Sequence, residues 1–221
     1  NCRRFLREIR AFHGSFWRRM AAGIAAYSGL GWAGIHALQE GNRLRHGWEL
    51  DLPRLEMEPV AEWGPWADEI WEATRERCSM IGVRDHTTLA YLYPLANERW
   101  TAYRLRQNAR TIGWTVLLVT RMADNPYFGD MLVGTLLDAL AMPGYEGAVA
   151  HSSRRALEEQ GADLILTNQA HHRWIEAFRR DGFLTGPSNF LLATSVPLTA
   201  LLQPPDSIHL TRGDGDGRIA S

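Results

Sequence analysis

The sequence predicts an α+β fold in which helices flank a mixed, mostly antiparallel sheet, with a helical appendage at the N-terminus. Three observations predict this class. Helical and strand-like segments follow one another as two helices, three strands, a helix, a strand, a helix and a strand. The three successive strands are joined by turns, as antiparallel neighbours are. The 221 residues are 45% hydrophobic and 22% charged, enough for one domain with a full core.

The appendage is expected over residues 1–45. Its stretch Met20–Gln39 is rich in the small residues Ala and Gly and contains no Asp, Glu or Arg. Ala and Gly contribute little transfer free energy compared with Leu or Ile. We therefore expect a helix packed on its own or a neighbouring domain rather than a membrane span. Because the chain opens with Asn1, we also expect part of a longer or tandem protein, with an upstream domain or a homo-oligomer as the alternatives.

Residues 46–65 carry many turn formers and charges, including Pro53 and Pro59, and predict a linker. The main domain is expected over residues 66–217, followed by a tail at 218–221. Helical periodicity over Trp66–Met80 predicts the first helix of this domain.

The remaining elements follow from alternation, β-branched runs and turn residues. Asn108 and Ala109 lie where a hairpin turn is expected, and Gly161 and Gly182 lie where helices end. The predicted order is a helix around Thr87–Tyr93, strands over Trp100–Gln107, Ile112–Thr120 and Met131–Ala141, a helix over Gly147–Gln160, a strand over Asp163–Thr167, a helix over Ala170–Arg180 and a last strand over Phe190–Ser195.

The basic residues exclude several kinds of chemistry. All 24 are Arg, and the chain has no Lys. P-loops, protein kinases, pyridoxal phosphate enzymes and Schiff-base aldolases all depend on a lysine, so none of these classes fits. The net charge of -1 also disfavours binding to nucleic acid.

Cys2 and Cys78 are the only cysteines, and they are far apart. This spacing excludes a disulfide scaffold and gives no zinc motif. A reducing, cytoplasmic compartment is expected.

Three segments carry a resemblance to a known family. The longest is Leu136–Phe183, with Pro143, Gly144, Tyr145 and Gly147 in its central turn; the others are "RDHTTLAYLYP" at Arg84–Pro94 and "SIHLTRGDGDG" at Ser207–Gly217. Together with the element order, they resemble the GNAT superfamily of N-acetyltransferases, in its bacterial GNAT-like and Fem-like branches. The resemblance runs from about Val60 to Gly217.

The resemblance implies an acyltransferase that moves an acyl group from acyl-CoA to an amine or hydroxyl without a metal. The acceptor would be a small molecule, or a sugar amine or peptide of the bacterial envelope. In this family a strand edge pairs with the pantetheine arm of CoA, and the next helix N-terminus faces the pyrophosphate. The corresponding donor contacts here are Leu140, Ala141, Met142, Tyr145, Gly147, Ala148 and Asn168.

Three positions depart from the family pattern. Glu146 stands where Arg or Gln is usual, and its carboxylate would repel a pyrophosphate unless it points to solvent. Val149 replaces a second Gly, and Phe178 replaces the Tyr that often protonates the leaving thiolate. A binding or scaffold domain that kept the fold and lost the chemistry is therefore the alternative. A Fem-like transfer from aminoacyl-tRNA is disfavoured by the near-neutral charge.

The candidate catalytic residues are Asp138, Tyr145 and His171. Asp138 lies within an apolar strand, where burial would raise its pKa toward that of a general base, although a structural carboxylate is the alternative. Tyr145 would supply the missing acid, and the alternative is that its ring packs against the sheet. His171 would act as an acid or base, and the alternative is a solvated position at the start of a helix. Asp214 and Asp216 lack the closing Glu of a calcium loop, so a flexible tail is expected there.

Overall fold

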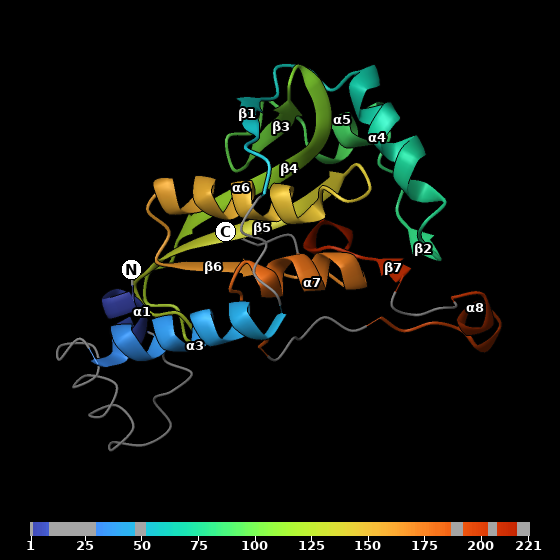
Figure 1. The fold of residues 1–221 in the computed structure, drawn as a ribbon. Helices are drawn as coiled ribbons and strands as arrows, with labels where there is room; N and C mark the ends of the chain where they lie inside the picture. The colour runs from blue at the N-terminus through green and yellow to red at the C-terminus, as the bar shows by residue number, and fades with distance from the viewer. Residues whose placement is uncertain (1, 9–29, 47–51, 187–191, 203–206, 216–221) are drawn as a thin grey trace.

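The computed structural model describes residues 2–8, 30–46, 52–186, 192–202 and 207–215 (Figure 1). Its helices and strands, with one 3-10 turn at the end, are α1 (Cys2–Glu8), α3 (Leu30–His46), β1 (Glu56–Pro59), α4 (Pro65–Arg75), β2 (Met80–Ile81), α5 (His86–Leu92), β3 (Thr101–Gln107), β4 (Arg110–Arg121), β5 (Leu132–Ala141), α6 (Glu146–Glu159), β6 (Leu164–Thr167), α7 (His172–Arg180), α8 (Val196–Leu201), β7 (Ile208–His209) and η3 (Arg212–Asp214).

A five-stranded sheet in the order β1-β3-β4-β5-β6 forms the centre of the molecule. Its neighbours are antiparallel except for β5 and β6, which are parallel and joined through α6. The predicted fold class, a mostly antiparallel sheet flanked by helices, is therefore confirmed. The expectation of a plain linker over residues 46–65 is wrong in one respect, because β1 lies inside it and pairs with β3 as an edge strand.

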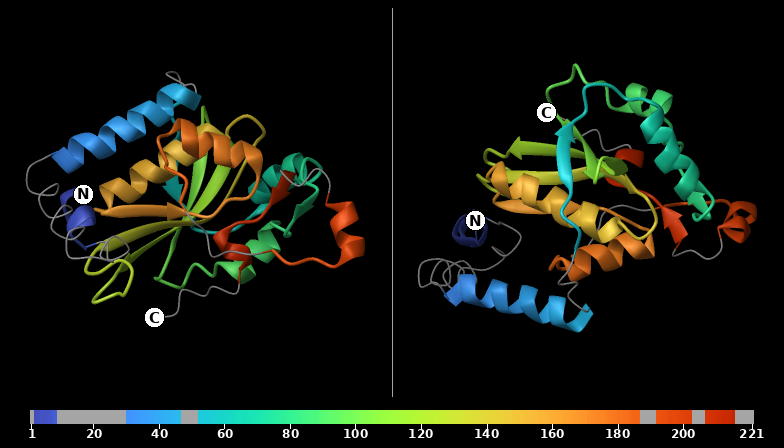
Figure 2. Two further views of the ribbon diagram at one scale, coloured as in Figure 1. Left: turned by 90° about the horizontal axis from the view of Figure 1, so that it is seen from below. Right: turned by 45° about the horizontal axis from the view of Figure 1, so that its top comes forward.

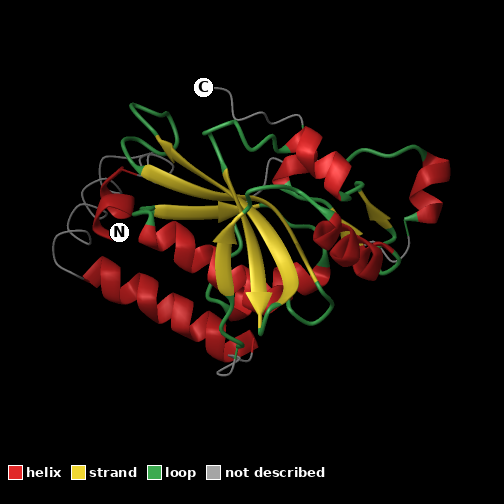
Figure 3. Cartoon of the chain, turned by 90° about the horizontal axis from the view of Figure 1, so that it is seen from above, coloured by secondary structure: helices red, strands yellow, loops and turns green. Residues whose placement is uncertain are grey.

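The helices cover the two faces of the sheet separately. Buried side chains of α4 and α5, such as Ile70 and Leu89, form one core cluster with Trp114 and Leu140. Residues of α6 and α7 form a second cluster with other strand side chains, including Leu117 and Leu136. Figures 1 and 3 show α6 and α7 lying together, away from α4 and α5.

The turns confirm part of the sequence prediction and correct another part. Asn108 and Ala109 join β3 to β4 with φ values of 47° and 68°, as a two-residue hairpin turn requires. The helix expected over Trp66–Met80 ends earlier, at Arg75, and Met80 instead begins the short strand β2.

The C-terminal part differs most from the prediction. Residues 192–195 of the strand expected over Phe190–Ser195 form no strand, and residues 190–191 lie outside the described part of the chain. The chain instead forms α8, which projects from the side of the molecule that carries β2 (Figure 2). It then returns as β7, which pairs in parallel with β2. The expectation of a flexible tail at Asp214 is wrong, because this residue belongs to η3. Its carboxylate accepts a hydrogen bond from the backbone N–H of Thr211, the N-cap residue of η3.

The N-terminal helices pack on the main domain. Arg4 on α1 donates to the carbonyl of Asp130 at 2.9 Å. Asn42 on α3 donates to the carbonyls of Arg179 and Phe183, at 3.1 and 2.7 Å. Of the stretch Met20–Gln39, residues 20–29 lie outside the described part. Within the described ranges, no helix has the length and apolar character needed to cross a bilayer.

Candidate active site

One edge of β5 is open over its second half. The parallel pairing with β6 runs from Val133–Leu164 to Leu136–Thr167 and stops there. Among the strands that the structure describes, none pairs with Leu137–Ala141 on this side. A bulge at Leu137 bends β5 at the point where the pairing ends. The backbone groups of Ala139 and Ala141 on this edge are therefore not used for strand pairing among the described residues.

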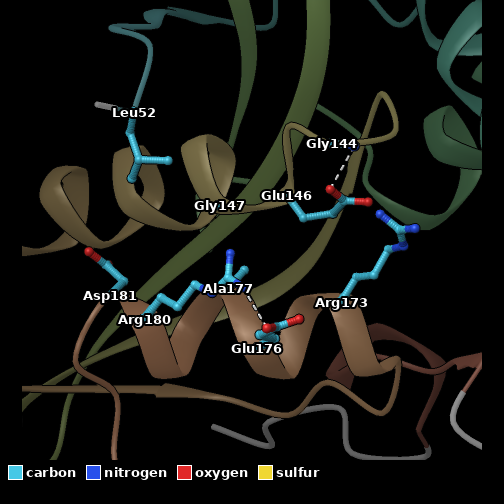
Figure 4. Close-up of a pocket in the computed structure, with 9 residues that line it drawn as sticks. All are labelled: Leu52, Gly144, Glu146, Gly147, Arg173, Glu176, Ala177, Arg180 and Asp181. Carbon is cyan, nitrogen blue, oxygen red and sulfur yellow. Dashed lines mark hydrogen bonds and ion pairs between the residues drawn. The ribbon is translucent and has the colours of Figure 1, made fainter. Parts of the chain in front are cut away.

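A cavity of about 200 Å³ lies beside the N-terminus of α6 (Figure 4). Arg173 extends into it from α7 and forms no ion pair with the described residues. Arg180 is paired with Glu176 at 2.6 Å. A helix N-terminus and a nearby arginine both favour anions, so this cavity suits a negatively charged group. Its lining consists of Leu52, Gly144, Glu146, Gly147, Arg173, Glu176, Ala177, Arg180 and Asp181.

Glu146 turns back onto its own loop. Its carboxylate accepts a hydrogen bond of 2.8 Å from the backbone N–H of Gly144 (Figure 4). The bond therefore occupies one backbone donor of the loop before α6. The sequence analysis considered a carboxylate that faces the pyrophosphate or one that points to solvent, and it did not foresee this bond within the loop.

Val149 is fully buried in the core beneath α6. Its Cγ2 atom lies over Gly113 of β4. Because Gly113 has no side chain, the strand leaves room for the side chain of Val149. Val149 does not line the cavity.

A second, smaller cavity of about 20 Å³ adjoins the first, since both are lined by Glu146 and Arg173. A space of this size holds about one water molecule. Its walls come from both sides of the sheet: Thr74, Arg77 and Cys78 at the end of α4, and Ala141, Pro143, His171, Trp174 and His209. The small cavity therefore connects the donor side with the side of the sheet that carries α4.

His209 is a buried polar residue in the wall of the small cavity. It is 1% exposed, and its Nε2 atom has no hydrogen-bond partner among the described residues. The ring bonds to the backbone of Ala139, and because this bond raises the pKa, the carbonyl of Ala139 is the acceptor and Nδ1 the donor. Burial, and then the charge of Arg84, lower the pKa of His209 to about 3. The imidazole is thus neutral, with a free lone pair on Nε2.

The polar backbone groups of the open edge are largely occupied by side chains. The N–H of Ala139 donates to Asp138 Oδ1 at 2.9 Å, and its carbonyl accepts from His209. The carbonyl of Ala141 accepts from Thr74 Oγ1 at 3.2 Å. A ligand that pairs with this edge has to displace some of these bonds.

Asp138 belongs to a buried ionic network. Its Oδ2 accepts from Arg84 Nε at 2.7 Å and from the Tyr93 hydroxyl at 2.9 Å. Arg84 also donates to Asp214. Burial raises the pKa of Asp138, and the charge of Arg84 opposes this rise. For Arg84, burial lowers the pKa, but the two carboxylates outweigh it and raise the pKa above its usual value.

The other predicted residues are dispersed. Tyr145 is the N-cap residue of α6 and packs against the core, and His171 caps α7 by accepting from the N–H of Arg173 at 3.2 Å. Asn168 accepts from Arg212 at 3.2 Å. Phe178 is buried against Trp174 and Phe183. Of the predicted residues, Ala141 and His171 meet at the small cavity, and Gly147 lines the large one.

Sequence reasoning did not select His209, Arg84 or Tyr93. Arg84, Tyr93 and His209 all lie in the segments that carried the resemblance, but spacing alone gave no signal that they meet. His209 comes from β7, whose pairing with β2 was not predicted.

Comparison with known proteins adds structural likenesses only. No family model matches the chain, and no curated protein matches it. Solved structures that resemble it include a GNAT family acetyltransferase from Staphylococcus aureus, with 9% identity, a TM-score of 0.44 and coverage of 63% of this chain and 98% of that one. A ribosomal-protein-alanine N-acetyltransferase from Brucella melitensis has 10% identity and a TM-score of 0.45, with coverage of 63% and 99%. An acetyltransferase from Trypanosoma brucei has 14% identity and a TM-score of 0.45, with coverage of 64% and 100%. Function has to be argued from the residues of the site.

Proposed function

We propose that this domain is an acyltransferase that moves an acyl group from acyl-CoA to an amine or hydroxyl. The observation that carries the proposal is the open edge at Leu137–Ala141 beside a cavity that suits an anion. An extended amide chain is the natural partner of an open strand edge, and a phosphate is the natural partner of a helix N-terminus. The pantetheine and pyrophosphate of CoA combine both groups in one molecule.

The proposed donor contacts follow from this arrangement. Of the expected contacts on β5, the backbone of Ala141 faces the open edge, whereas Leu140 pairs with Trp114 and the N–H of Met142 donates to the carbonyl of Ile112 on β4. The pantetheine arm would therefore pair with Ala141, and the start of α6, at Gly147 and Ala148, would face the pyrophosphate. Arg173 supplies the cation that the loop lacks at Glu146. Tyr145, another expected contact, is the N-cap residue of α6, and Asn168 directly follows β6.

The residues present fit such a donor in one further respect. Several buried polar atoms have no partner in the described part of the chain: Thr167 Oγ1 at the end of β6, both polar side-chain atoms of Gln169, and Nε2 of His209 in the wall of the small cavity. Buried polar groups normally have partners, so these atoms are consistent with a polar ligand or water. Asp138 is fully buried and engaged, and we assign it a structural role rather than that of a base.

A non-catalytic binding or scaffold domain is the second candidate. The hydrogen bond from Gly144 to Glu146 and the occupied carbonyls of Ala139 and Ala141 favour it. These contacts satisfy the protein's own polar groups in the absence of any donor. The two candidates differ in whether acyl-CoA can displace them.

Calorimetric titration with acetyl-CoA tests the proposal, with thermal unfolding as a second readout. A donor at 100 times its dissociation constant is expected to stabilise the fold by about 2.7 kcal/mol. Arg173→Gln should weaken binding, whereas Arg110→Gln, at the exposed first residue of β4, should not. Absence of both heat and thermal shift in the wild type would contradict the proposal and leave the scaffold function.

A further inference from the structure

His209 lies where the two sides of the proposed reaction would meet. The small cavity is lined on one side by Glu146 and Arg173, which also line the donor cavity, and on the other by Thr74 and Cys78 of the α4 region. A donor whose phosphates lie at the start of α6 extends its arm along the open edge from Met142 toward Ala139. These three residues of strand span on the order of 10 Å. The thioester end therefore approaches Ala139, whose carbonyl holds His209.

Resting on the function proposed above, we propose that His209 is a catalytic residue, whose Nε2 atom takes the proton of the attacking amine or hydroxyl and passes it to the leaving sulfur. The new C–N or C–O bond forms as the N–H or O–H proton moves to Nε2. The C–S bond then breaks with its electron pair on sulfur, and the proton moves from Nε2 to that sulfur. The imidazole returns to its neutral form, and the products are the acylated acceptor and the free thiol.

The hydrogen bond to Ala139 prepares His209 for this role. Because Nδ1 donates to the carbonyl, the neutral ring has its lone pair on Nε2, and the orientation of the ring is fixed. Nε2 is buried and has no partner in the described chain, although it lies in a wall of the cavity. A buried acceptor of this kind accepts a proton donor that enters the cavity.

The low pKa of His209 suits the second half of the proton transfer. A protonated imidazole with a pKa of about 3 is a strong acid and readily protonates a thiolate. It is a weak base, so the acceptor has to arrive as a neutral amine or a hydroxyl rather than as an ammonium. This acid also replaces the hydroxyl that Phe178 cannot supply.

The small cavity holds about one water in its present form, so the acyl group needs the space that Glu146 and Arg173 now occupy between the cavities. Arg173 is exposed and without an ion pair, so its side chain turns outward at little cost. Glu146 gives up one hydrogen bond to Gly144.

The test uses acetyl-CoA as donor and hydroxylamine as a small neutral acceptor, with acetohydroxamate as the measured product. His209→Asn keeps a donor near the position of Nδ1, for the carbonyl of Ala139, and removes the lone pair of Nε2. His172→Asn, an exposed neighbour of the cavity residue His171, is the matched control. Binding of acetyl-CoA is measured separately by calorimetry for each protein, and the uncatalysed rate is subtracted.

We expect His209→Asn to lower the turnover rate about 100-fold or more, with the dissociation constant of acetyl-CoA unchanged, and His172→Asn to change neither. Equal turnover by the wild type and His209→Asn would overturn the role of His209 while the proposed function stands. Binding without turnover in the wild type would also overturn it, leaving donor binding intact. Absence of binding in the wild type would remove the proposed function and this role together.

A second measurement on the wild type applies if His209→Asn fails to fold. In ¹⁵N spectra of the histidine rings, His209 should show the shift of an unprotonated Nε2, and that signal should move when acetyl-CoA is added. An Nε2 signal that does not respond to saturating acetyl-CoA would overturn the proposal.

Discussion

Val149 on α6 packs directly over Gly113 on β4. A Cβ atom added to Gly113 would lie 2.6 Å from Cγ2 of Val149 and 3.0 Å from the carbonyl oxygen of Leu140. The two positions therefore share one volume, and a side chain on the helix is compatible with the fold because the strand has none. This explains how α6 tolerates Val149 at a position where glycine was expected.

This shared volume predicts an energetic coupling. Gly113→Ala should destabilise the wild type by about 1–3 kcal/mol through overpacking. The same substitution should cost less in a Val149→Ala background, since Cγ2 is then absent. Chemical denaturation of the two single variants and the double variant gives the coupling energy, for which we expect about 0.5–3 kcal/mol. Additive effects would show that the two side chains do not compete for space.

Arg84 should be one of the most sensitive positions in the protein. Arg84→Met removes the cation from between Asp138 and Asp214, so a fully buried carboxylate is left without its partner. Loss of one member of a buried pair costs about 3–5 kcal/mol. We expect urea unfolding to show a loss of this size, and Arg110→Met, an exposed position, to show little change.

The double variant Arg84→Met with Asp138→Asn provides the control for this explanation. Removal of the carboxylate charge should recover part of the lost stability, because the uncompensated charge is then gone. A double variant no more stable than Arg84→Met would instead assign the loss to packing of the arginine side chain.

The sequence predicted the sheet and the helices of the central region because their periodicity is local. Strands β3 to β6 and helices α6 and α7 carry alternation or helical spacing in their own residues. It did not predict β1, β2 or β7, since strands of two to four residues contain too little periodicity to be recognised unless, as in β6, they form an apolar run. Their existence depends on partners that are distant in sequence.

The candidate site was also predictable only in part, namely where its residues are contiguous in sequence. The donor loop at Pro143–Gly147 and the strand before it are contiguous in sequence, and the family resemblance of this segment implied a pyrophosphate site there. His209 meets Ala139 across 70 positions, and Arg84 meets Asp138 across 54, so no local pattern reveals either contact. Glu146 was recognised as unusual, but its bond to Gly144 depends on the loop geometry, with Gly144 at a φ of +92°.

Glu146→Arg should tighten the binding of acetyl-CoA if the donor site is functional. The substitution frees the N–H of Gly144 and adds a cation, and a charge-assisted contact is worth about 1.5–3 kcal/mol, or about ten-fold or more in affinity. Calorimetric titration measures the change. Glu98→Arg, at an exposed position elsewhere, makes the same change in net charge and should leave the affinity unaltered. Equal gains in both variants would mean that the effect is long-range attraction rather than a contact in the loop.

His209 should make the protein less stable as the pH falls below 6.5. Its pKa is about 3 in the folded protein, against 6.5 when unperturbed, so between these values only the unfolded chain takes up the proton. Its contribution to stability is therefore complete above pH 6.5 and is lost at about 1.4 kcal/mol per pH unit as the pH falls toward 3.

The comparison with His209→Asn isolates this effect from other titrating groups. The charged or titratable groups around the ring are Arg84, Asp214 and His171. Asp138 has a raised pKa, so its effect on the free energy of unfolding is opposite to that of His209 and favours the folded state as the pH falls. Unfolding free energies of the wild type and the variant, measured between pH 7.5 and 5, should converge as the pH falls. Parallel curves would contradict the assignment of a buried neutral imidazole.

The side chains that join α6 to α7 determine how the molecule can respond to a ligand. Asp181, at the end of α7, accepts from Arg154 and His151 of α6 at 2.6 and 2.8 Å, while Arg84 fixes β5 to the C-terminal segment on the opposite face. The last turn of α7 also holds the N-terminal helix, because Asn42 on α3 donates to the carbonyls of Arg179 and Phe183. Arg180 and Asp181 of the same turn line the larger cavity. The appendage and the cavity therefore share one support, the C-terminal end of α7.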